Sequence, residues 1–281
     1  MAKTISILFL TVVQFFLSAC GILSTPQEKP KTETPQQVID QPLSQLNSPL
    51  QLTDDLTTFD GRIGLYARNL KTNQTLHFNQ DVIFPTASTH KLVIAMAIYK
   101  YLYPEASLIE KQHYDESIKQ MMIISDNPAF YELLDDIEQK QPDAITHVLR
   151  DLKLVYTKIH NREAFLEYGY HSVTTPYEMS LIFETIYNEI YLGKEFSSIL
   201  KEELGSTIFQ EEIPRYLQGK KILHKVGELP GIQCDVGIVD DGQDLILISI
   251  YTTTEQPPPY ASNFIADISA KTYYMLKKLH P

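Results

Sequence analysis

The sequence predicts an α/β (α+β) fold, in which a mixed antiparallel sheet is built from both ends of the chain. Helices flank this sheet, and an all-helical lobe is inserted between its two groups of strands. Two observations predict this arrangement. Residues with β-type alternation lie at 63–79 and at 222–253, and the segment between them has helical spacing. Neither group of strands is large enough to be stable alone, so the two groups are expected to pair.

The first group of strands is predicted to be a hairpin. Residues 63–68 and 75–79 alternate like strands on either side of the sequence NLKTNQ. A proline turn follows at Pro85, and an amphipathic helix is expected to begin near Ser88.

The middle of the chain is predicted to be mostly helical. The sequence DESIKQMMIISDNPAFYELLDDI predicts two helices separated by a break at 125–128, and Pro128 suits the first turn of the second helix. A short helix is expected at 143–153. The weak periodicity of 154–173 predicts a loop, and another helix is expected to follow Thr175.

The last part of the chain supplies the second group of strands. The sequences ILHKVGEL, CDVGIV and LILISIYTT, at 222–229, 234–239 and 245–253, are typical of strands. A final helix is expected over 261–279.

The N-terminal residues have the pattern of a targeting segment. Residues 1–20 contain Lys3, then the apolar run ISILFLTVVQFFL, and end in LSAC, which resembles the lipobox of bacterial lipoproteins. This resemblance implies cleavage before Cys20 and acylation of its thiol; the alternative is an ordinary signal peptide with an incidental cysteine. Residues 21–42, rich in Pro, Thr, Gln and charge, are expected to form a disordered tether, and 43–281 the folded domain. We therefore expect a lipid-anchored protein of the bacterial cell envelope that faces the periplasm or extracytoplasmic space.

Composition narrows the classes of partner. The formal net charge of −11 argues against binding to nucleic acid and against a basic membrane-binding face. Cys234 is the only other cysteine and is expected to be a small core residue. No zinc-ligand spacing or glycine-rich phosphate loop is present, so we expect no metal or cofactor. We also expect a monomer.

Ser88 and Lys91 are spaced as a nucleophile and its base would be. Positions i and i+3 share one face of a helix, so the Lys91 amine is placed to reach the Ser88 hydroxyl. A desolvated lysine loses affinity for its proton and is able to act as a base. The alternative is that Thr86 or Ser88 caps the helix and Lys91 is solvated.

Two further short sequences are candidates for the same site. Ser125, Asp126 and Asn127 stand at the predicted break between two helices, where a serine could relay a proton and an amide could hold a carbonyl group; the alternative is helix capping. Lys225 and Gly227 lie on a predicted strand, where a lysine could approach the nucleophile; the alternative is a partly exposed strand lysine.

The combination is more informative than any one of its parts. Ser-x-x-Lys, Ser-Asp-Asn and Lys-x-Gly occur in this order, as in the serine β-lactamase and penicillin-binding D,D-peptidase superfamily. The sequences VTTPYEM and HKVGELPG also resemble this superfamily, and class A β-lactamases most closely. The resemblance covers residues from about 60 to the C-terminus and implies a class A β-lactamase-like fold.

The resemblance also implies residue roles. Ser88 would be the acylated nucleophile, Lys91 its activator, and Ser125 the proton relay to the leaving nitrogen. Asn127 would position Lys91 and the amide side chain of the substrate. Lys225 would support Ser125 and hold the substrate carboxylate.

The late strand is expected to complete the substrate-binding site. By resemblance, Gly227 and Glu228 lie where the strand meets the substrate, and the backbone N–H groups of Ser88 and Glu228 would form an oxyanion hole. No hydroxyl is available at Val226, where the superfamily has Thr or Ser.

The residue expected to activate the deacylating water is Glu163. It matches the class A pattern Glu-x-x-Leu-Asn only in part, because Glu167 replaces the asparagine. A solvated loop carboxylate is the alternative for Glu163.

The resemblance therefore implies β-lactam hydrolysis by serine acylation. Two alternatives stay open: a cell-wall D,D-carboxypeptidase or transpeptidase that acts on peptidoglycan stem peptides, and an envelope binding protein of the same fold that does not turn its ligand over.

Overall fold

The computed structural model describes residues 49–278. The predicted signal peptide, the acylation site at Cys20 and the tether at 21–42 lie outside the described residues. Within the described part of the chain, no helix is both long enough and apolar enough to cross a bilayer.

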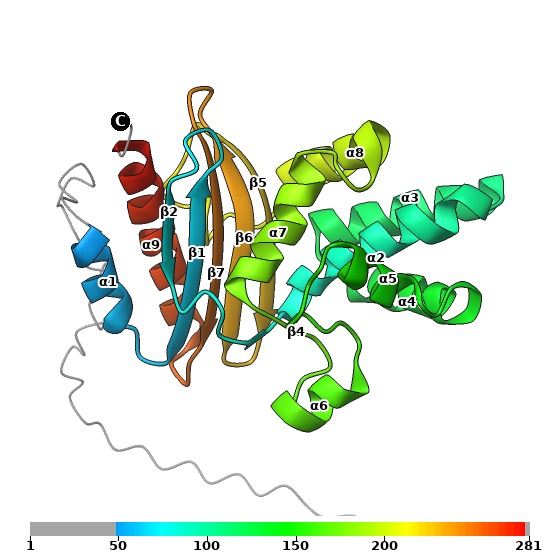
Figure 1. Cartoon of the computed structure of the whole chain (residues 1–281), viewed down its shortest axis with the longest axis horizontal. Coiled ribbons are helices and arrows are strands. Elements are labelled where there is room, and N and C mark those ends of the chain that lie inside the picture. Colours follow the sequence, from blue (N-terminus) through cyan, green and yellow to red (C-terminus); the bar gives the residue numbers. More distant parts are fainter. Residues whose placement is uncertain (1–48, 279–281) are drawn as a thin grey trace, which may run out of the picture. The chain divides into compact units, whose positions relative to one another are not determined.

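A five-stranded antiparallel sheet forms the centre of the fold and confirms that strands from both chain ends meet (Figure 1). Arg62 near the start pairs with Thr253 near the end. The predicted hairpin and the three late strands are all present. In spatial order the strands are β2 (Thr75–Phe78), β1 (Arg62–Asn69), β7 (Leu245–Thr253), β6 (Ile232–Asp240) and β5 (Lys221–Leu229).

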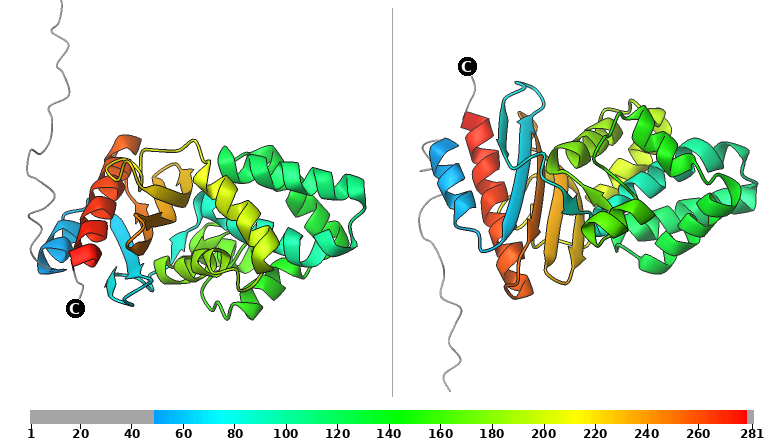
Figure 2. Two further views of the ribbon diagram at one scale, coloured as in Figure 1. Left: turned by 90° about the horizontal axis from the view of Figure 1, so that it is seen from above. Right: turned by 60° about the horizontal axis from the view of Figure 1, so that its bottom comes forward.

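One face of the sheet is covered by two helices from opposite ends of the described chain. These are α1 (Pro49–Thr57) and α9 (Pro258–Lys278), which lie together beside the sheet in Figures 1 and 2. Leu52 and Leu56 of α1 join one apolar core with Ile265 and Ile268 of α9. Helix α9 begins three residues before its predicted start, and α1 was not predicted.

The other face of the sheet carries the inserted helical lobe (Figure 2). The lobe confirms the predicted helical middle of the chain. It contains the 3₁₀ helix η2 (Ala87–His90), α2 (Lys91–Ala97), the π helix η3 (Ile98–Leu102), the 3₁₀ helix η4 (Tyr103–Glu105), α3 (Leu108–Ile123), α4 (Asn127–Lys140), α5 (Ala144–Asp151), α6 (Arg162–Tyr168), α7 (Pro176–Tyr187) and α8 (Gly193–Gly205).

The loop prediction for residues 154–173 is wrong at α6. Asn161 begins this helix by accepting a hydrogen bond from the backbone N–H of Ala164, and Gly169 ends it in the left-handed conformation with φ of 78°. Helix α8 was also not predicted, although Leu200 and Leu204 lie one turn apart and are fully buried.

A small two-stranded sheet joins the chain before the candidate nucleophile to the loop that carries α6. β3 (Phe84–Pro85) pairs with β4 (Val173–Thr174), and the N–H of Thr86 donates to the carbonyl of Ser172 at 3.1 Å. The entry to η2 is therefore fixed by a segment about ninety residues later in the chain.

Candidate active site

Ser88 lies in η2, the short 3₁₀ turn that leads directly into the buried helix α2. The preceding residue, Ala87, has φ of 43°, a conformation that is costly for a residue with a side chain. Within the described residues, no side-chain hydrogen bond caps η2 or α2, so Thr86 and Ser88 do not have the capping role that was the alternative. Because residues 91–97 are all buried, the helix behind Ser88 is held rigidly.

Lys91 connects three of the predicted site residues. Its Nζ donates to Ser88 Oγ at 3.2 Å and to Asn127 Oδ1 at 2.7 Å. It also donates to Ser125, to the carbonyl oxygen at 2.6 Å and to Oγ at 3.3 Å. The side chain is buried rather than solvated, which contradicts the alternative interpretation for Lys91.

Ser125 stands at the junction between α3 and α4, as the sequence predicted. Asp126 caps α4 by accepting from the N–H of Ala129 at 2.7 Å. Ser125 and Asn127 are thereby left to face Lys91. Ser125 has φ of 58°, so its backbone takes up a strained left-handed conformation at the point where its Oγ meets the lysines.

Lys225 reaches the same serine from the opposite side. It extends from β5 and is completely buried, and its Nζ donates to Ser125 Oγ at 2.9 Å and to the carbonyl of Val226 at 2.9 Å. The ring of Phe209 lies 5.8 Å from the same Nζ. The structure therefore brings Ser88, Lys91, Ser125, Asn127 and Lys225 into one hydrogen-bonded cluster.

Burial changes the proton affinity of both lysines. It lowers the pKa of Lys91 to about 8, while the charge of Asp126 opposes the shift. Burial, together with the positive charge of Lys91, lowers the pKa of Lys225 to about 7. A lysine whose pKa is lowered toward neutral pH is able to accept a proton from a serine hydroxyl. Lys91 therefore has the property that a base beside Ser88 needs.

Gly227 allows β5 to approach the candidate nucleophile closely. A Cβ atom at this position would lie 2.9 Å from the backbone nitrogen of Ser88 and 2.7 Å from Cys234 Sγ. Among the strands of residues 49–278, β5 is the last in the sheet, so one side of its backbone has no partner strand there. The backbone of Gly227 and Glu228 is thus beside Ser88, in the region predicted for substrate binding.

A buried pair behind Lys225 was not predicted. His224 and Asp235 are both almost fully buried, and His224 Nδ1 lies 3.0 Å from Asp235 Oδ1 and 3.0 Å from Oδ2. His224 Nε2 lies 3.1 Å from the carbonyl of Phe209, which only accepts hydrogen bonds. Nε2 must therefore carry a hydrogen. This bond holds the chain segment that places the Phe209 ring near Lys225.

Two other residues near the site contribute to packing. The His90 ring lies 4.6 Å from that of Phe130, and its Nδ1 is 3.2 Å from Thr86 Oγ1. Burial and the charges of Lys91 and Lys225 lower the pKa of His90 to about 3, so this imidazole is neutral. The expectation that Cys234 is a core residue is confirmed, because its free thiol is completely buried.

The structure does not bring Glu163 into this cluster. Glu163 is exposed in the first turn of α6, and within residues 49–278 no hydrogen bond or ion pair joins it to Ser88, Lys91 or Ser125. This position fits the alternative of a solvated carboxylate. Its predicted role in deacylation stays a prediction.

A different glutamate holds the base of the loop that carries α6. Glu178 is buried at the start of α7 and accepts hydrogen bonds from the backbone N–H groups of Val155, Tyr156 and Thr157 at 2.6–3.1 Å. The hydroxyl of Thr157 donates to it at 2.6 Å. Glu178 therefore fixes the point at which the loop leaves the helical lobe.

The described residues contain no group of three or more His, Cys, Asp or Glu side chains that is placed to hold a metal ion. The side chains that meet at Ser88 are instead two amines, two hydroxyls and an amide. This set is suited to moving protons and holding an oxyanion.

Comparison with protein families gives one match over most of the chain. A model described as "Beta-lactamase enzyme family" matches residues 50–116 and 110–276. A separate comparison with curated proteins finds no match.

Several solved structures share the fold. A β-lactamase from Sphaerobacter thermophilus is 18% identical with a TM-score of 0.69, and the match covers 83% of this chain and 98% of that one. A structure of PBP-A is 21% identical with a TM-score of 0.71, covering 82% of this chain and 96% of that one. A class A β-lactamase from Mycobacterium abscessus is 21% identical with a TM-score of 0.71, covering 82% and 99%.

Proposed function

Because the chain belongs to the β-lactamase enzyme family, we propose that it is a serine hydrolase that β-lactams acylate at Ser88 and that releases the acyl group by hydrolysis. One observation carries this proposal. Lys91 Nζ lies 3.2 Å from Ser88 Oγ, while Ser125 Oγ accepts hydrogen bonds from both Lys91 and Lys225. A variant of PBP-A, which shares the fold, has been solved as an acyl-enzyme complex with penicillin G.

The mechanism follows from these contacts. Neutral Lys91 takes the Ser88 proton as Oγ attacks the lactam carbonyl, and the nearby backbone N–H groups of Ser88 and Glu228 stabilise the oxyanion. Ser125 then passes its hydroxyl proton to the lactam nitrogen and receives from Lys91 the proton that came from Ser88, so the C–N bond breaks and Lys91 is neutral again. Water finally cleaves the ester bond to Ser88 and regenerates the free hydroxyl.

A second candidate is a D,D-peptidase that acts on cell-wall stem peptides. It uses the same acylation step and is favoured by the exposed position of Glu163, since a solvated carboxylate is poorly placed to activate water beside Ser88.

The lifetime of the acyl-enzyme separates these candidates. We expect purified protein to form a covalent adduct with a fluorescent penicillin, and Glu163→Gln to change the rate of adduct loss by less than about threefold, because the carboxylate is exposed and unconnected to the cluster. The measurement is loss of in-gel fluorescence after excess unlabelled penicillin is added. An adduct that persists for hours on the unsubstituted protein would favour the D,D-peptidase, and a more than hundredfold longer lifetime in Glu163→Gln would identify Glu163 as the deacylating base.

The lowered pKa of Lys91 predicts how acylation depends on pH. Below about pH 8 Lys91 is mostly protonated and is not able to take the Ser88 proton, so the acylation rate rises with pH as this proton leaves. Lys225 loses its proton at lower pH, near pH 7, so the two titrations give no separate maximum between these values. We expect the second-order rate of penicillin labelling to be half-maximal near pH 8. A rate that is constant until Lys91 reaches its ordinary pKa near 10.5 would contradict this prediction.

A further inference from the structure

The ring of Phe209 covers the amine of Lys225, although its backbone lies outside the sheet. The ring centre is 5.8 Å from Lys225 Nζ. Phe209 is partly exposed, whereas Lys225 is completely buried. The position of this ring therefore controls whether water reaches the amine that contacts Ser125.

The segment that carries Phe209 is attached to the rest of the fold on both sides of this residue. The N–H of Ile208 donates to a carbonyl at the end of α3 at 3.2 Å, and the N–H of Ile213 donates to Asp235 Oδ2 at 3.1 Å. Between these points, the carbonyl of Phe209 accepts from His224 Nε2 at 3.1 Å. Within residues 49–278, this is the only hydrogen bond made by the Phe209 backbone. His224 therefore fixes Phe209 within the segment.

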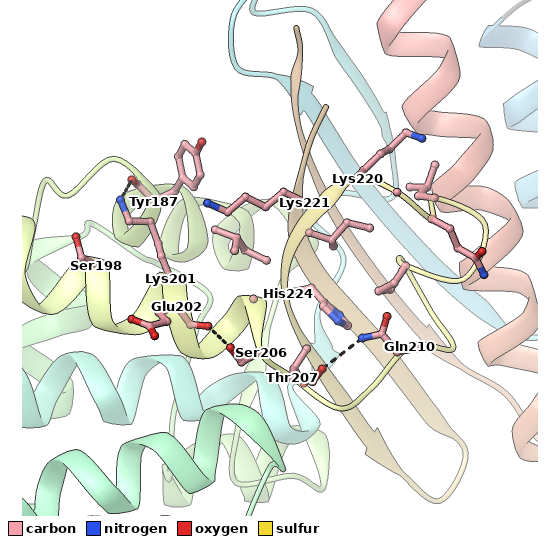
Figure 3. Close-up of a pocket in the computed structure, with 17 residues that line it drawn as sticks. Tyr187, Ser198, Lys201, Glu202, Ser206, Thr207, Gln210, Lys220, Lys221 and His224 are labelled. Atoms are coloured by element: carbon pink, nitrogen blue, oxygen red, sulfur yellow. Dashed lines mark hydrogen bonds between the residues drawn. The ribbon is translucent and has the colours of Figure 1, made fainter. Parts of the chain in front are cut away.

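His224 is itself held in one orientation. Its Nδ1 lies 3.0 Å from both carboxylate oxygens of Asp235, and both side chains are almost fully buried. Figure 3 shows the His224 side chain extending from β5 toward the loop on which Thr207 and Gln210 lie. A ring that is bonded at both nitrogens has a fixed orientation, so it forms a rigid link from β6 to Phe209.

We propose that this buried pair holds the ring of Phe209 over Lys225 and so keeps water away from the amine. His224 and Asp235 are thus positioning residues for the acylation proposed above, and the inference rests on that proposed function. Within the described residues, neither side chain makes a hydrogen bond or ion pair with Lys225. The pair therefore acts on Lys225 through Phe209.

Exclusion of water sets the order in which the two amines of the cluster lose their protons. Burial is the main cause that lowers the pKa of Lys225 to about 7; the charge of Lys91 lowers it further, whereas Asp235 and Cys234 of β6 oppose the shift. Burial lowers the pKa of Lys91 only to about 8, with Asp126 opposing. Lys225 is therefore largely neutral when Lys91 releases its proton.

This order would change if water reached Lys225. Its pKa would rise toward the ordinary value near 10.5, so Lys225 would still be charged while Lys91 titrates. Both amines contact Ser125 Oγ, at 2.9 Å and 3.3 Å. A like charge so close disfavours the protonated form of Lys91, so the half-maximal acylation rate would move below pH 8.

The test measures the proton affinity of Lys225 directly, by NMR titration of protein that contains isotope-labelled lysine. The Lys225 signal is assigned by its absence in Lys225→Met. We expect a midpoint near pH 7 in the unsubstituted protein, and a midpoint about one pH unit or more higher in Phe209→Ala, which removes the ring. The matched control is Gln210→Ala. Gln210 is exposed, follows Phe209 and donates to the carbonyl of Thr207, so this substitution should move the midpoint by less than about 0.3 pH units.

Two substitutions of His224 separate its two hydrogen bonds. The amide nitrogen of glutamine takes the place of Nε2 and is able to donate to the Phe209 carbonyl, whereas that of asparagine takes the place of Nδ1 and reaches Asp235. His224→Asn should therefore raise the Lys225 midpoint as Phe209→Ala does, and His224→Gln should raise it less than about half as much. Penicillin labelling should become half-maximal about 0.5–1 pH unit lower in His224→Asn and Phe209→Ala.

Two outcomes would overturn the proposal. One is an unchanged Lys225 midpoint in Phe209→Ala, and the other is an equal rise in His224→Asn and His224→Gln, which would assign the effect to the charge of Asp235. Thermal unfolding shows that each variant is folded, and Phe209→Ala keeps both hydrogen bonds of His224 in place. The titration does not depend on acylation, so a failure of penicillin to label the unsubstituted protein would contradict the proposed function alone.

Discussion

Replacing Ser88 with alanine is expected to abolish covalent labelling by a fluorescent penicillin. The substitution removes the oxygen that Lys91 Nζ approaches at 3.2 Å, and no other hydroxyl in the cluster has this position at the start of a buried helix. Loss of a catalytic nucleophile lowers turnover by at least about 10³-fold in serine hydrolases, so the labelled band should fall below detection.

The control for this experiment is Ser198→Ala, which removes an exposed hydroxyl on α8 and should leave the labelling rate unchanged. Ser125→Ala is informative as well, because it removes the oxygen that both lysines share but leaves the nucleophile. Labelling that persists in Ser88→Ala would show that another residue is acylated, and the proposed function would then fail at its first step.

Replacing Glu178 with alanine is expected to cause a large loss of stability, because this side chain of α7 holds the start of the loop that carries α6. The substitution removes the acceptor of three backbone N–H groups, of which that of Thr157 is fully buried, whereas the Thr157 hydroxyl keeps Thr174 Oγ1 as a partner at 2.8 Å. Each buried donor that loses its partner costs about 1–3 kcal/mol. We expect the free energy of unfolding to fall by about 3–5 kcal/mol in urea denaturation.

Two comparisons make this prediction specific. Glu178→Gln keeps one acceptor oxygen and should cost less than the alanine substitution. Glu105→Ala removes an exposed carboxylate and should change stability by less than about 0.5 kcal/mol. If Glu178→Ala and Glu105→Ala have the same effect, the hydrogen bonds to Glu178 contribute nothing to stability.

The residues of the Ser88 cluster were predictable because each leaves a local signal. Ser88 and Lys91 are three positions apart, and Ser125 and Asn127 stand next to a proline at a helix break. The role of Glu163 in activating water is predicted from a partial match to the class A pattern, and the structure places this residue on an exposed helix turn. Sequence spacing does not determine how far such a turn lies from the nucleophile.

The contacts of His224 could not be predicted from local sequence. Its partners are Asp235 on the next strand and the carbonyl of Phe209 in the segment before β5. They meet only once the sheet has formed and the segment has folded against it. By contrast, α6 and α8 had usable signals, since Asn161 is a good cap and Leu200 and Leu204 have helical spacing.

The free edge of β5 has a consequence for solubility. An unpaired strand edge is a template on which strands of other chains assemble, so the edge that is proposed to bind a substrate is also a potential site of aggregation. This strand has exposed charges near both ends, at Lys221 and Glu228, and Pro230 directly follows it. Charge and proline at strand ends oppose such assembly. The residues at the two ends of this strand therefore help to keep the protein from associating with copies of itself through the β5 edge.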